Sequence, residues 1–252
     1  MAKARKNIND KEKPSLFTCL SPALLHLYDV SDSIVVIIDV LRATSTIATA
    51  IANGAKSVIP VETVAECIKL GRQMEVITAG ERDGQIAEGL TYGNTPFQYT
   101  SEFIKNKTLV LTTTNGTKLL HMALTAGASD IITGSFPNLS AVCSYLTTQK
   151  RNVILACAAW KDKVNIEDTL FAGAVISCIK ENFTIKCDSS QIALSMYNDA
   201  KNDLFEYMKG KEASHYHRLM GFGLEEDIRY CLAADGAPVL PVYQDGRLTR
   251  HK

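Results

Sequence analysis

Short runs of β-branched, apolar residues alternate with helix-like segments along most of this chain of 252 residues. The clearest run, IVVII at residues 34–38, is wholly apolar, as expected for a strand that is covered on both faces. Residues 43–53 follow with a helical pattern that ends before Gly54, and residues 57–61 form the next predicted strand. This alternation predicts an α/β fold with three α/β/α layers, in which helices cover both faces of a mostly parallel or mixed sheet.

The C-terminal third departs from this alternation. Residues 189–234 have an almost wholly helical pattern, and the two prolines of PVLPV at residues 238–242 predict an edge strand. Residues 1–13 are polar and basic, and we expect them to form a disordered leader. We expect residues 14–252 to form a single α/β domain of two packed lobes, with the lobe boundary, if there is one, near residues 135–150.

Charge and composition narrow the function class. The 27 basic and 27 acidic side chains cancel, which argues against a protein that coats nucleic acid or an anionic membrane. No apolar run reaches the roughly 18 residues that a membrane helix needs. The seven cysteines show no Cys-x-x-Cys spacing, which is typical of reduced thiols in a cytoplasmic protein. We therefore expect a cytoplasmic protein without nucleic-acid or membrane partners, and the sequence leaves a homo-oligomer open.

Polar residues follow the predicted strands. In open α/β sheets, ligands bind beyond the carboxyl ends of the strands. Asp39 comes directly after the run at 34–38, and Arg42 stands in the same loop. A buried carboxylate needs a cation, a metal or several donors, and a guanidinium can grip phosphate oxygens with two hydrogen bonds. We predict that Asp39 and Arg42 are catalytic; the alternative is that Asp39 caps the following helix or pairs with Arg42.

Two turns rich in hydroxyl groups predict phosphate binding. Thr44 and Ser45 stand at the start of a predicted helix, where backbone N–H groups favour an anion, although the same residues are ordinary helix caps. The second turn follows the strand predicted at residues 109–111, and its glycine allows the backbone to approach a ligand closely. The residues predicted to bind phosphate in this second turn are Thr114, Asn115, Gly116 and Thr117.

Further carboxylates predict a magnesium site. Mg²⁺ prefers oxygen ligands and keeps several of its waters. Glu81 follows a predicted strand that ends near Thr78, and Glu167 and Asp168 open another predicted helix. We predict that Asp39 holds Mg²⁺ with help from Glu81 or Asp168. Alternatively, Glu167 and Asp168 are first-turn residues favoured by the helix dipole.

Other polar or aromatic residues are less informative. His215 and His217 are two positions apart, so they do not share one face of a helix, and a surface role is expected for both. Trp160 follows a predicted strand and either lines the pocket or packs against the core.

With these residues assembled, the chain resembles the 2-phosphosulfolactate phosphatase family of the coenzyme M pathway from about Leu20 to Leu248. The motifs that carry the resemblance are Asp39-Val-Leu-Arg-Ala-Thr-Ser-Thr46, Gly80-Glu-Arg82, Gly93-Asn-Thr-Pro96, Thr113-Thr-Asn-Gly-Thr117, Gly134-Ser-Phe-Pro-Asn138 and Glu167-Asp168. The resemblance implies Mg²⁺-dependent hydrolysis of 2-phosphosulfolactate to sulfolactate and phosphate by a phosphoric monoester hydrolase. It also implies a three-layer α/β/α fold in two lobes.

Two positions depart from the family pattern and bear on the substrate. Thr91 stands where an acid is common, and Gln98 stands where a glutamate is common. We expect the phosphoryl group of a small anionic phosphoester to bind at the turns described above. Its carboxylate or sulfonate is then expected to meet Arg82 or Lys118.

Alternative functions remain open at this stage. The chain could act on another small anionic phosphoester, or it could be a non-catalytic homologue that only binds a phosphorylated ligand. A haloacid-dehalogenase-type phosphatase is disfavoured, because Leu41 replaces the second acid of its Asp-x-Asp motif. The residues do not decide between attack by water and a phospho-enzyme on Asp39, and we favour activated water.

Overall fold

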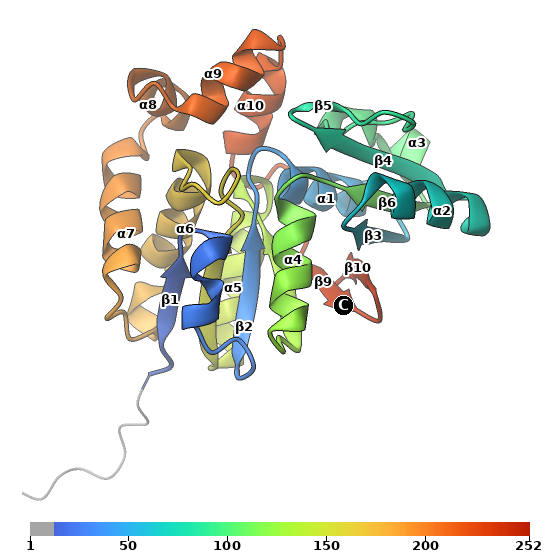
Figure 1. Cartoon of the computed structure of the whole chain (residues 1–252). Coiled ribbons are helices and arrows are strands. Elements are labelled where there is room, and N and C mark those ends of the chain that lie inside the picture. The colour runs from blue at the N-terminus through green and yellow to red at the C-terminus, as the bar shows by residue number, and fades with distance from the viewer. Residues whose placement is uncertain (1–12) are drawn as a thin grey trace, which may run out of the picture.

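The computed structural model describes residues 13–252, so the predicted leader lies outside the described residues except for Lys13. Its strands form one ten-stranded sheet in the order β1-β8-β2-β7-β9-β10-β3-β6-β4-β5. Figure 1 shows helices on both faces of this sheet. The strands are β1 (Leu16–Cys19), β2 (Ser33–Ile38), β3 (Ser57–Val61), β4 (Ile77–Arg82), β5 (Gln85–Ile86), β6 (Thr108–Thr112), β7 (Asp130–Gly134), β8 (Asn152–Cys157), β9 (Pro241–Gln244) and β10 (Arg247–Arg250). The α-helices are α1 (Ala43–Ala52), α2 (Val64–Met74), α3 (Ser101–Ile104), α4 (Gly116–Thr125), α5 (Leu139–Gln149), α6 (Ile166–Ile179), α7 (Asp188–Ala200), α8 (Leu204–Gly210), α9 (Ser214–Gly221) and α10 (Glu225–Leu232).

Strand β2 explains why helices cover both faces of the sheet. All six of its residues are buried, and side chains along a strand point alternately to opposite faces. Ile34 and Val36 belong to a core that includes residues of α5, α6 and α7, whereas Val35 and Ile37 belong to a second core with α1 and α4. The apolar run at 34–38 therefore needs two helical layers, and the predicted three-layer α/β/α fold is confirmed.

The sheet is mixed because two antiparallel strands lie in its interior. β7 pairs with β9, β9 with β10, and β10 with β3, all antiparallel, while the strands outside this segment pair mainly in parallel. The prediction of an edge strand at residues 238–242 is therefore wrong. Pro238 precedes the strand and Pro241 is its first residue, so neither proline interrupts the ladder beyond the strand's start.

The C-terminal helices lie at one end of the sheet. The predicted helical character of residues 189–234 is confirmed by α7 to α10. In Figure 1, α8, α9 and α10 lie at the end toward which β2 points, and the β4–β5 hairpin lies beside them. The segment at 135–150, where a lobe boundary was predicted, connects β7 and β8, which both pair with β2. A division into two lobes stays a prediction.

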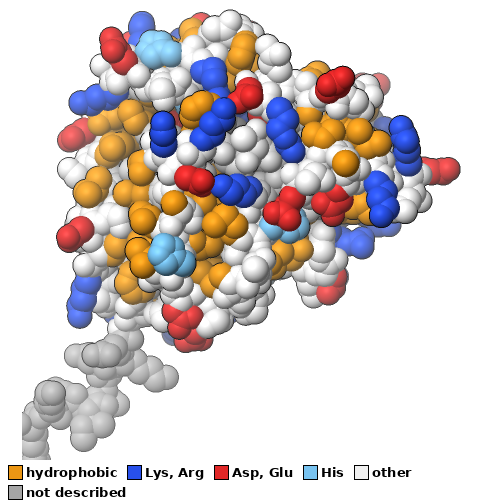
Figure 2. Space-filling model, viewed as in Figure 1, with side chains coloured by type: hydrophobic (Ala, Val, Ile, Leu, Met, Phe, Trp, Pro, Cys, Tyr) orange, Lys and Arg blue, Asp and Glu red, His pale blue; other side chains and the backbone are white. Residues whose placement is uncertain are grey.

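The surface carries charges of both signs. In Figure 2, acidic and basic side chains are interspersed over the visible face, and neither sign covers it. Among the described residues, no helix combines the length and the apolar character that crossing a bilayer requires.

Candidate functional site

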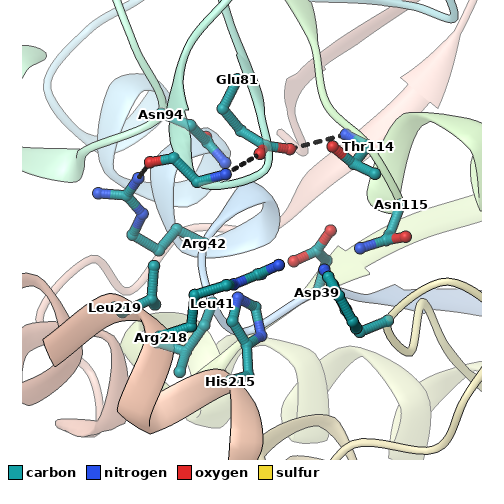
Figure 3. A pocket seen from close by; sticks show the side chains of 12 residues that line it. Asp39, Leu41, Arg42, Glu81, Asn94, Thr114, Asn115, His215, Arg218 and Leu219 are labelled. Carbon is teal, nitrogen blue, oxygen red and sulfur yellow. Dashed lines mark hydrogen bonds between the residues drawn. The ribbon is translucent and has the colours of Figure 1, made fainter. Parts of the chain in front are cut away.

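A polar cavity lies where β2, β4 and β6 end, with helix α9 on its other side (Figure 3). The cavity is lined by Asp39, Leu41, Arg42, Glu81, Gly84, Asn94, Thr114, Asn115, Trp160, His215, Arg218 and Leu219. We call Asp39, Glu81, Thr114 and Asn115 the strand-end wall, because they lie at the ends of the three strands. We call His215, Arg218 and Leu219, which all belong to α9, the helical wall.

Asp39 is the central carboxylate of the strand-end wall. It follows β2 directly and is only 8% exposed. Burial, and then the charge of Glu81, raise the pKa of Asp39 to about 6. A side chain at Gly116 would place its Cβ 2.7 Å from Asp39 Oδ2, so only glycine lets the start of α4 approach this closely. The amino end of α4, whose dipole favours negative charge, is thereby held beside Asp39.

Glu81 connects two turns at the edge of the cavity. One carboxylate oxygen accepts a hydrogen bond from the Gly84 N–H at 2.9 Å, and the other accepts one from the Thr114 N–H at 2.7 Å. Glu81 lies within β4, which extends four residues beyond the strand end predicted near Thr78. The side chain is therefore fixed by backbone donors from both turns.

The predicted phosphate-binding turns use most of their hydroxyl groups internally. Thr44 Oγ1 donates to the Asp39 carbonyl at 2.8 Å, Ser45 Oγ to the Val40 carbonyl at 2.8 Å, and Thr117 Oγ1 to the Thr113 carbonyl at 2.9 Å. None of these three side chains lines the cavity. They stabilise the loops that present Asp39 and the start of α4.

Thr114 and Asn115 do line the cavity, as the sequence predicts for phosphate-binding residues. Thr114 Oγ1 is buried and has no hydrogen-bond partner among residues 13–252. The Asn115 side chain lies next to Asp39 in Figure 3 and accepts a 3.3 Å hydrogen bond from the Lys161 N–H. Both side chains are therefore positioned to meet a ligand beside Asp39.

Arg42 borders the cavity, but its guanidinium group is bound by other protein groups. Its Nη1 forms a buried ion pair with Asp227 of α10, and its Nη2 donates to the Gly84 carbonyl at 3.3 Å. The other oxygen of Asp227 accepts a 2.7 Å hydrogen bond from Thr95 Oγ1. This network attaches the loop after β2 to α10 and compensates the charge of Arg42.

The two cations predicted to meet the far end of the substrate do not line the cavity. Arg82 donates to the Glu81 carbonyl at 2.6 Å and to Thr112 Oγ1 at 2.9 Å. Lys118 forms an exposed ion pair with Asp162 at 2.9 Å. Both are engaged with neighbouring protein groups.

Asp168, predicted as a metal ligand, lies behind the cavity and accepts hydrogen bonds from three directions. These come from the Val40 N–H at 2.9 Å, the Ala159 N–H at 3.1 Å and Asn165 Nδ2 at 3.0 Å. Burial and the neighbouring Glu167 raise the pKa of Asp168 well above its ordinary value. The residue joins the loops after β2 and β8, and the structure brings only Asp39 and Glu81 together at the cavity.

The helical wall contains residues that were not predicted for the site. His215 is 8% exposed, and its Nδ1 lies 2.5 Å from Glu167 Oε1, so the surface role predicted for it is wrong. His217 is exposed, as predicted. Arg218 lies 4.3 Å above the Trp160 ring, and Trp160 does line the cavity. No sequence motif indicated His215 or Arg218, because α9 is placed here only by tertiary packing.

The donor set suits a magnesium ion. Residues 13–252 contain no cluster of three His, Cys, Asp or Glu side chains that could hold a metal by itself. Asp39 and Glu81 both line the cavity, however, and Asn94 Oδ1 and Thr114 Oγ1 are buried there without partners. Mg²⁺ is usually bound by one or two carboxylates together with waters and substrate oxygens. The oxygen-rich wall therefore fits this ion.

The fold and the cavity define an α/β/α protein with a carboxylate-lined site at the carboxyl ends of its strands. A sequence profile of the 2-phosphosulpholactate phosphatase family matches residues 19–246. The chain therefore belongs to the 2-phosphosulfolactate phosphatase family, as its motifs predicted. The expected enzyme class, a phosphoric monoester hydrolase, follows from this membership.

Three relatives illustrate the extent of the similarity, and each bears the name "Probable 2-phosphosulfolactate phosphatase". The protein of Caldanaerobacter subterraneus subsp. tengcongensis is 37% identical over 222 residues, which cover 86% of this chain and 90% of the relative. That of Thermotoga petrophila is 41% identical over 211 residues, covering 84% and 89%. That of Clostridium tetani is 37% identical over 220 residues, covering 86% and 92%.

Proposed function

We propose that this protein hydrolyses 2-phosphosulfolactate to sulfolactate and inorganic phosphate, with Mg²⁺ as its cofactor. The observation that carries the proposal is the pair of carboxylates, Asp39 and Glu81, at the strand-end wall. Burial and the charge of Glu81 raise the pKa of Asp39 to about 6, so the cavity favours a cation beside these groups. A phosphoester is anionic, so its charge is complementary to that of a divalent cation bound there. Membership of the family supports 2-phosphosulfolactate as the substrate.

The residues of the strand-end wall have distinct roles in the proposed reaction. Asp39 and Glu81 would hold Mg²⁺, which when bound neutralises charge on the phosphate oxygens. Asn115 and the amino end of α4 orient the phosphoryl group, and Thr114 Oγ1 offers it a hydroxyl. A water oxygen forms the new bond to phosphorus and the water gives up a proton. The ester P–O bond breaks, and the sulfolactate oxygen keeps the bonding electron pair and takes up a proton to become a hydroxyl. We favour water as the nucleophile because Asp39 is assigned to the metal.

A second candidate substrate is another small anionic phosphoester. Gln98, where the family commonly has a glutamate, lines a neighbouring hollow together with Arg42, Gly84 and Asn94, which also border the cavity. Thr91, the other departure, is exposed and lines neither. Of the two departures, Gln98 is therefore the one that favours a different organic group on the substrate.

Cellular setting is part of the same proposal. The resemblance of the motifs supports a role in coenzyme M biosynthesis, and the balance of 27 basic and 27 acidic side chains supports a cytoplasmic protein that binds no nucleic acid. The identity of neighbouring genes tests the pathway: genes for sulfolactate metabolism support it, and their absence argues for another one.

The test is phosphate release by the purified full chain. We expect hydrolysis of 2-phosphosulfolactate in the presence of Mg²⁺, loss of activity with EDTA, and recovery when Mg²⁺ is added back. A panel of small phosphoesters, run in parallel, shows whether another compound is the better substrate. Tight binding of phosphate without turnover of any phosphoester would instead indicate a non-catalytic homologue.

A further inference from the structure

Arg218 lines the cavity, and two hydrogen-bond donors of its guanidinium group are unused among the described residues. Its Nε and Nη1 are buried, and neither has an acceptor among residues 13–252. The guanidinium is stacked over the Trp160 ring at 4.3 Å, so its orientation is set by packing. A buried donor without a partner costs about 1–3 kcal/mol, and more when it is charged. Such a group calls for an acceptor from outside the chain.

The surroundings of Arg218 indicate where this acceptor lies. The carboxylates of Glu81, Asp83, Glu167 and Asp39 act on its charge, yet none forms an ion pair with it within 4.0 Å among the described residues. Figure 3 shows the side chain directed into the cavity toward Asp39. An anion between Arg218 and a cation held by Asp39 and Glu81 would satisfy both sides.

Arg42, the arginine predicted from sequence to grip phosphate, is engaged differently. In Figure 3 its guanidinium points away from Asp39, toward the Gly84 carbonyl. Its Nη1 is paired with Asp227, and both side chains are only 6% exposed. Turning Arg42 toward a ligand would leave Asp227 as an uncompensated buried charge, which is strongly unfavourable.

We propose that Arg218, rather than Arg42, binds the oxygens of the phosphoryl group that reacts, and that Arg42 is a positioning residue for the loop after β2. This inference rests on the proposed phosphatase function. The planar guanidinium donates two hydrogen bonds to the phosphoryl oxygens while water attacks phosphorus and the ester bond breaks. Arg218 transfers no proton and stabilises the charge on those oxygens.

The experiment compares two substrates and one binding probe. The kcat and KM of wild type, Arg218→Gln and Arg218→Lys are measured with 2-phosphosulfolactate and with phenyl phosphate, which lacks the second and third anionic groups. Calorimetry measures the Kd of inorganic phosphate in Mg²⁺ buffer for the same proteins. Lys161→Gln is the matched control, because Lys161 also lies over the Trp160 ring, at 4.6 Å, but is exposed and does not line the cavity.

We expect Arg218→Gln to lower kcat/KM for both substrates by a similar factor, about 100- to 1,000-fold, and to weaken phosphate binding. Arg218→Lys should recover part of the loss, since it keeps the charge but not the planar fork. Lys161→Gln should stay near wild type. Thermal unfolding of each variant separates loss of the contact from loss of the fold.

Three results would overturn the assignment. A loss confined to 2-phosphosulfolactate, with phenyl phosphate and the phosphate Kd unchanged, would place Arg218 at the organic end of the substrate. A wild-type protein that binds no phosphate would remove the site altogether. A folded Arg218→Gln variant with unaltered kinetics would also overturn the assignment. If no phosphoester is hydrolysed, phosphate binding still tests Arg218, so failure of the proposed function is distinguished from failure of this inference.

Discussion

The strand-end wall and the helical wall of the cavity differ in how their side chains are held. In the strand-end wall, both oxygens of Glu81 accept backbone N–H groups, and Asp39 is packed against Gly116. In the helical wall, Arg218 has buried donors without partners, and only His215 has a carboxylate partner, Glu167.

This difference indicates a division of labour. The backbone donors fix Glu81 where its charge acts on the Asp39 carboxylate, and such a preorganised arrangement suits a metal-assisted reaction. The buried donors of Arg218, like Thr114 Oγ1 in the strand-end wall, gain partners only when a ligand arrives. We therefore expect the largest loss of activity from a variant of Asp39, a loss of phosphoryl binding and activity from variants of Arg218, and a loss of stability from variants of the neighbouring Arg42–Asp227 ion pair.

The largest effect is expected for Asp39→Asn. The amide keeps the shape of the side chain but loses the charge that the proposed metal site needs, so kcat/KM should fall by about 1,000-fold, the upper range for removing one preorganised electrostatic group. Phosphate release in Mg²⁺ measures this. Asp168→Asn, a change at a buried carboxylate behind the cavity, is the control and should cost less. An equal loss in both variants would contradict the separation of their roles.

The next prediction tests how α10 is attached to the loop after β2. Asp227→Ala leaves Arg42 as an uncompensated buried cation, so the free energy of unfolding should fall by about 3–5 kcal/mol. Urea denaturation followed by circular dichroism measures the change. The double variant Arg42→Met with Asp227→Leu should recover much of the stability, because apolar side chains replace a buried ion pair well. If it is as unstable as Asp227→Ala, the ion pair is not what holds α10 to the loop after β2.

Much of the strand-end wall could be predicted from sequence because strand ends are local features. The apolar run at 34–38 located β2, and Asp39 had to follow at its carboxyl end. β4 and β6 are parallel neighbours, which explains why Glu81 and Thr114 meet. β2 belongs to the other parallel set and runs in the opposite direction, because three antiparallel pairings separate it from β3, β6 and β4, so strand ends alone do not predict that Asp39 joins them. The interior position of β9 was not predictable in this way, since the two prolines resemble those of an edge strand.

The helical wall could not be predicted because no local pattern fixes where α9 packs. The spacing of His215 and His217 correctly indicated that they do not share a face, but it carried no information about Glu167, which lies 48 positions away in the chain. Arg218 resembled any charged residue of a surface helix. Its unused donors are visible only once α9 is placed over the cavity.

The third prediction concerns the stability of the metal-free protein. Because the pKa of Asp39 is about 6 in the folded state and 3.8 when unperturbed, the folded state binds more protons between these values. Stability should therefore fall as pH rises from 4 to 6, by about 3 kcal/mol at most for a shift of roughly two units. In EDTA, Asp39→Asn should be more stable than wild type at pH 8 and equal to it below pH 4. Equal stability at both pH values would show that the strand-end wall carries no electrostatic strain.

The smallest effect is expected from adding one methyl group beside each wall. Gly116 lies next to Asp39 of the strand-end wall, and Gly221 lies at the end of α9, which carries the helical wall. In Gly116→Ala, the Cβ would lie 2.7 Å from Asp39 Oδ2 and 2.9 Å from Ala43 Cβ, so we expect a loss of about 1–3 kcal/mol from overpacking, with reduced activity. Gly221→Ala, at the end of α9, meets no atom within 4 Å and is the matched control. It should be neutral or stabilising, since alanine favours a helix by up to about 1 kcal/mol over glycine. Thermal unfolding of the two variants measures the difference. Equal tolerance at both positions would mean that the start of α4 can move away from Asp39, and the strand-end wall would then not be the rigid one.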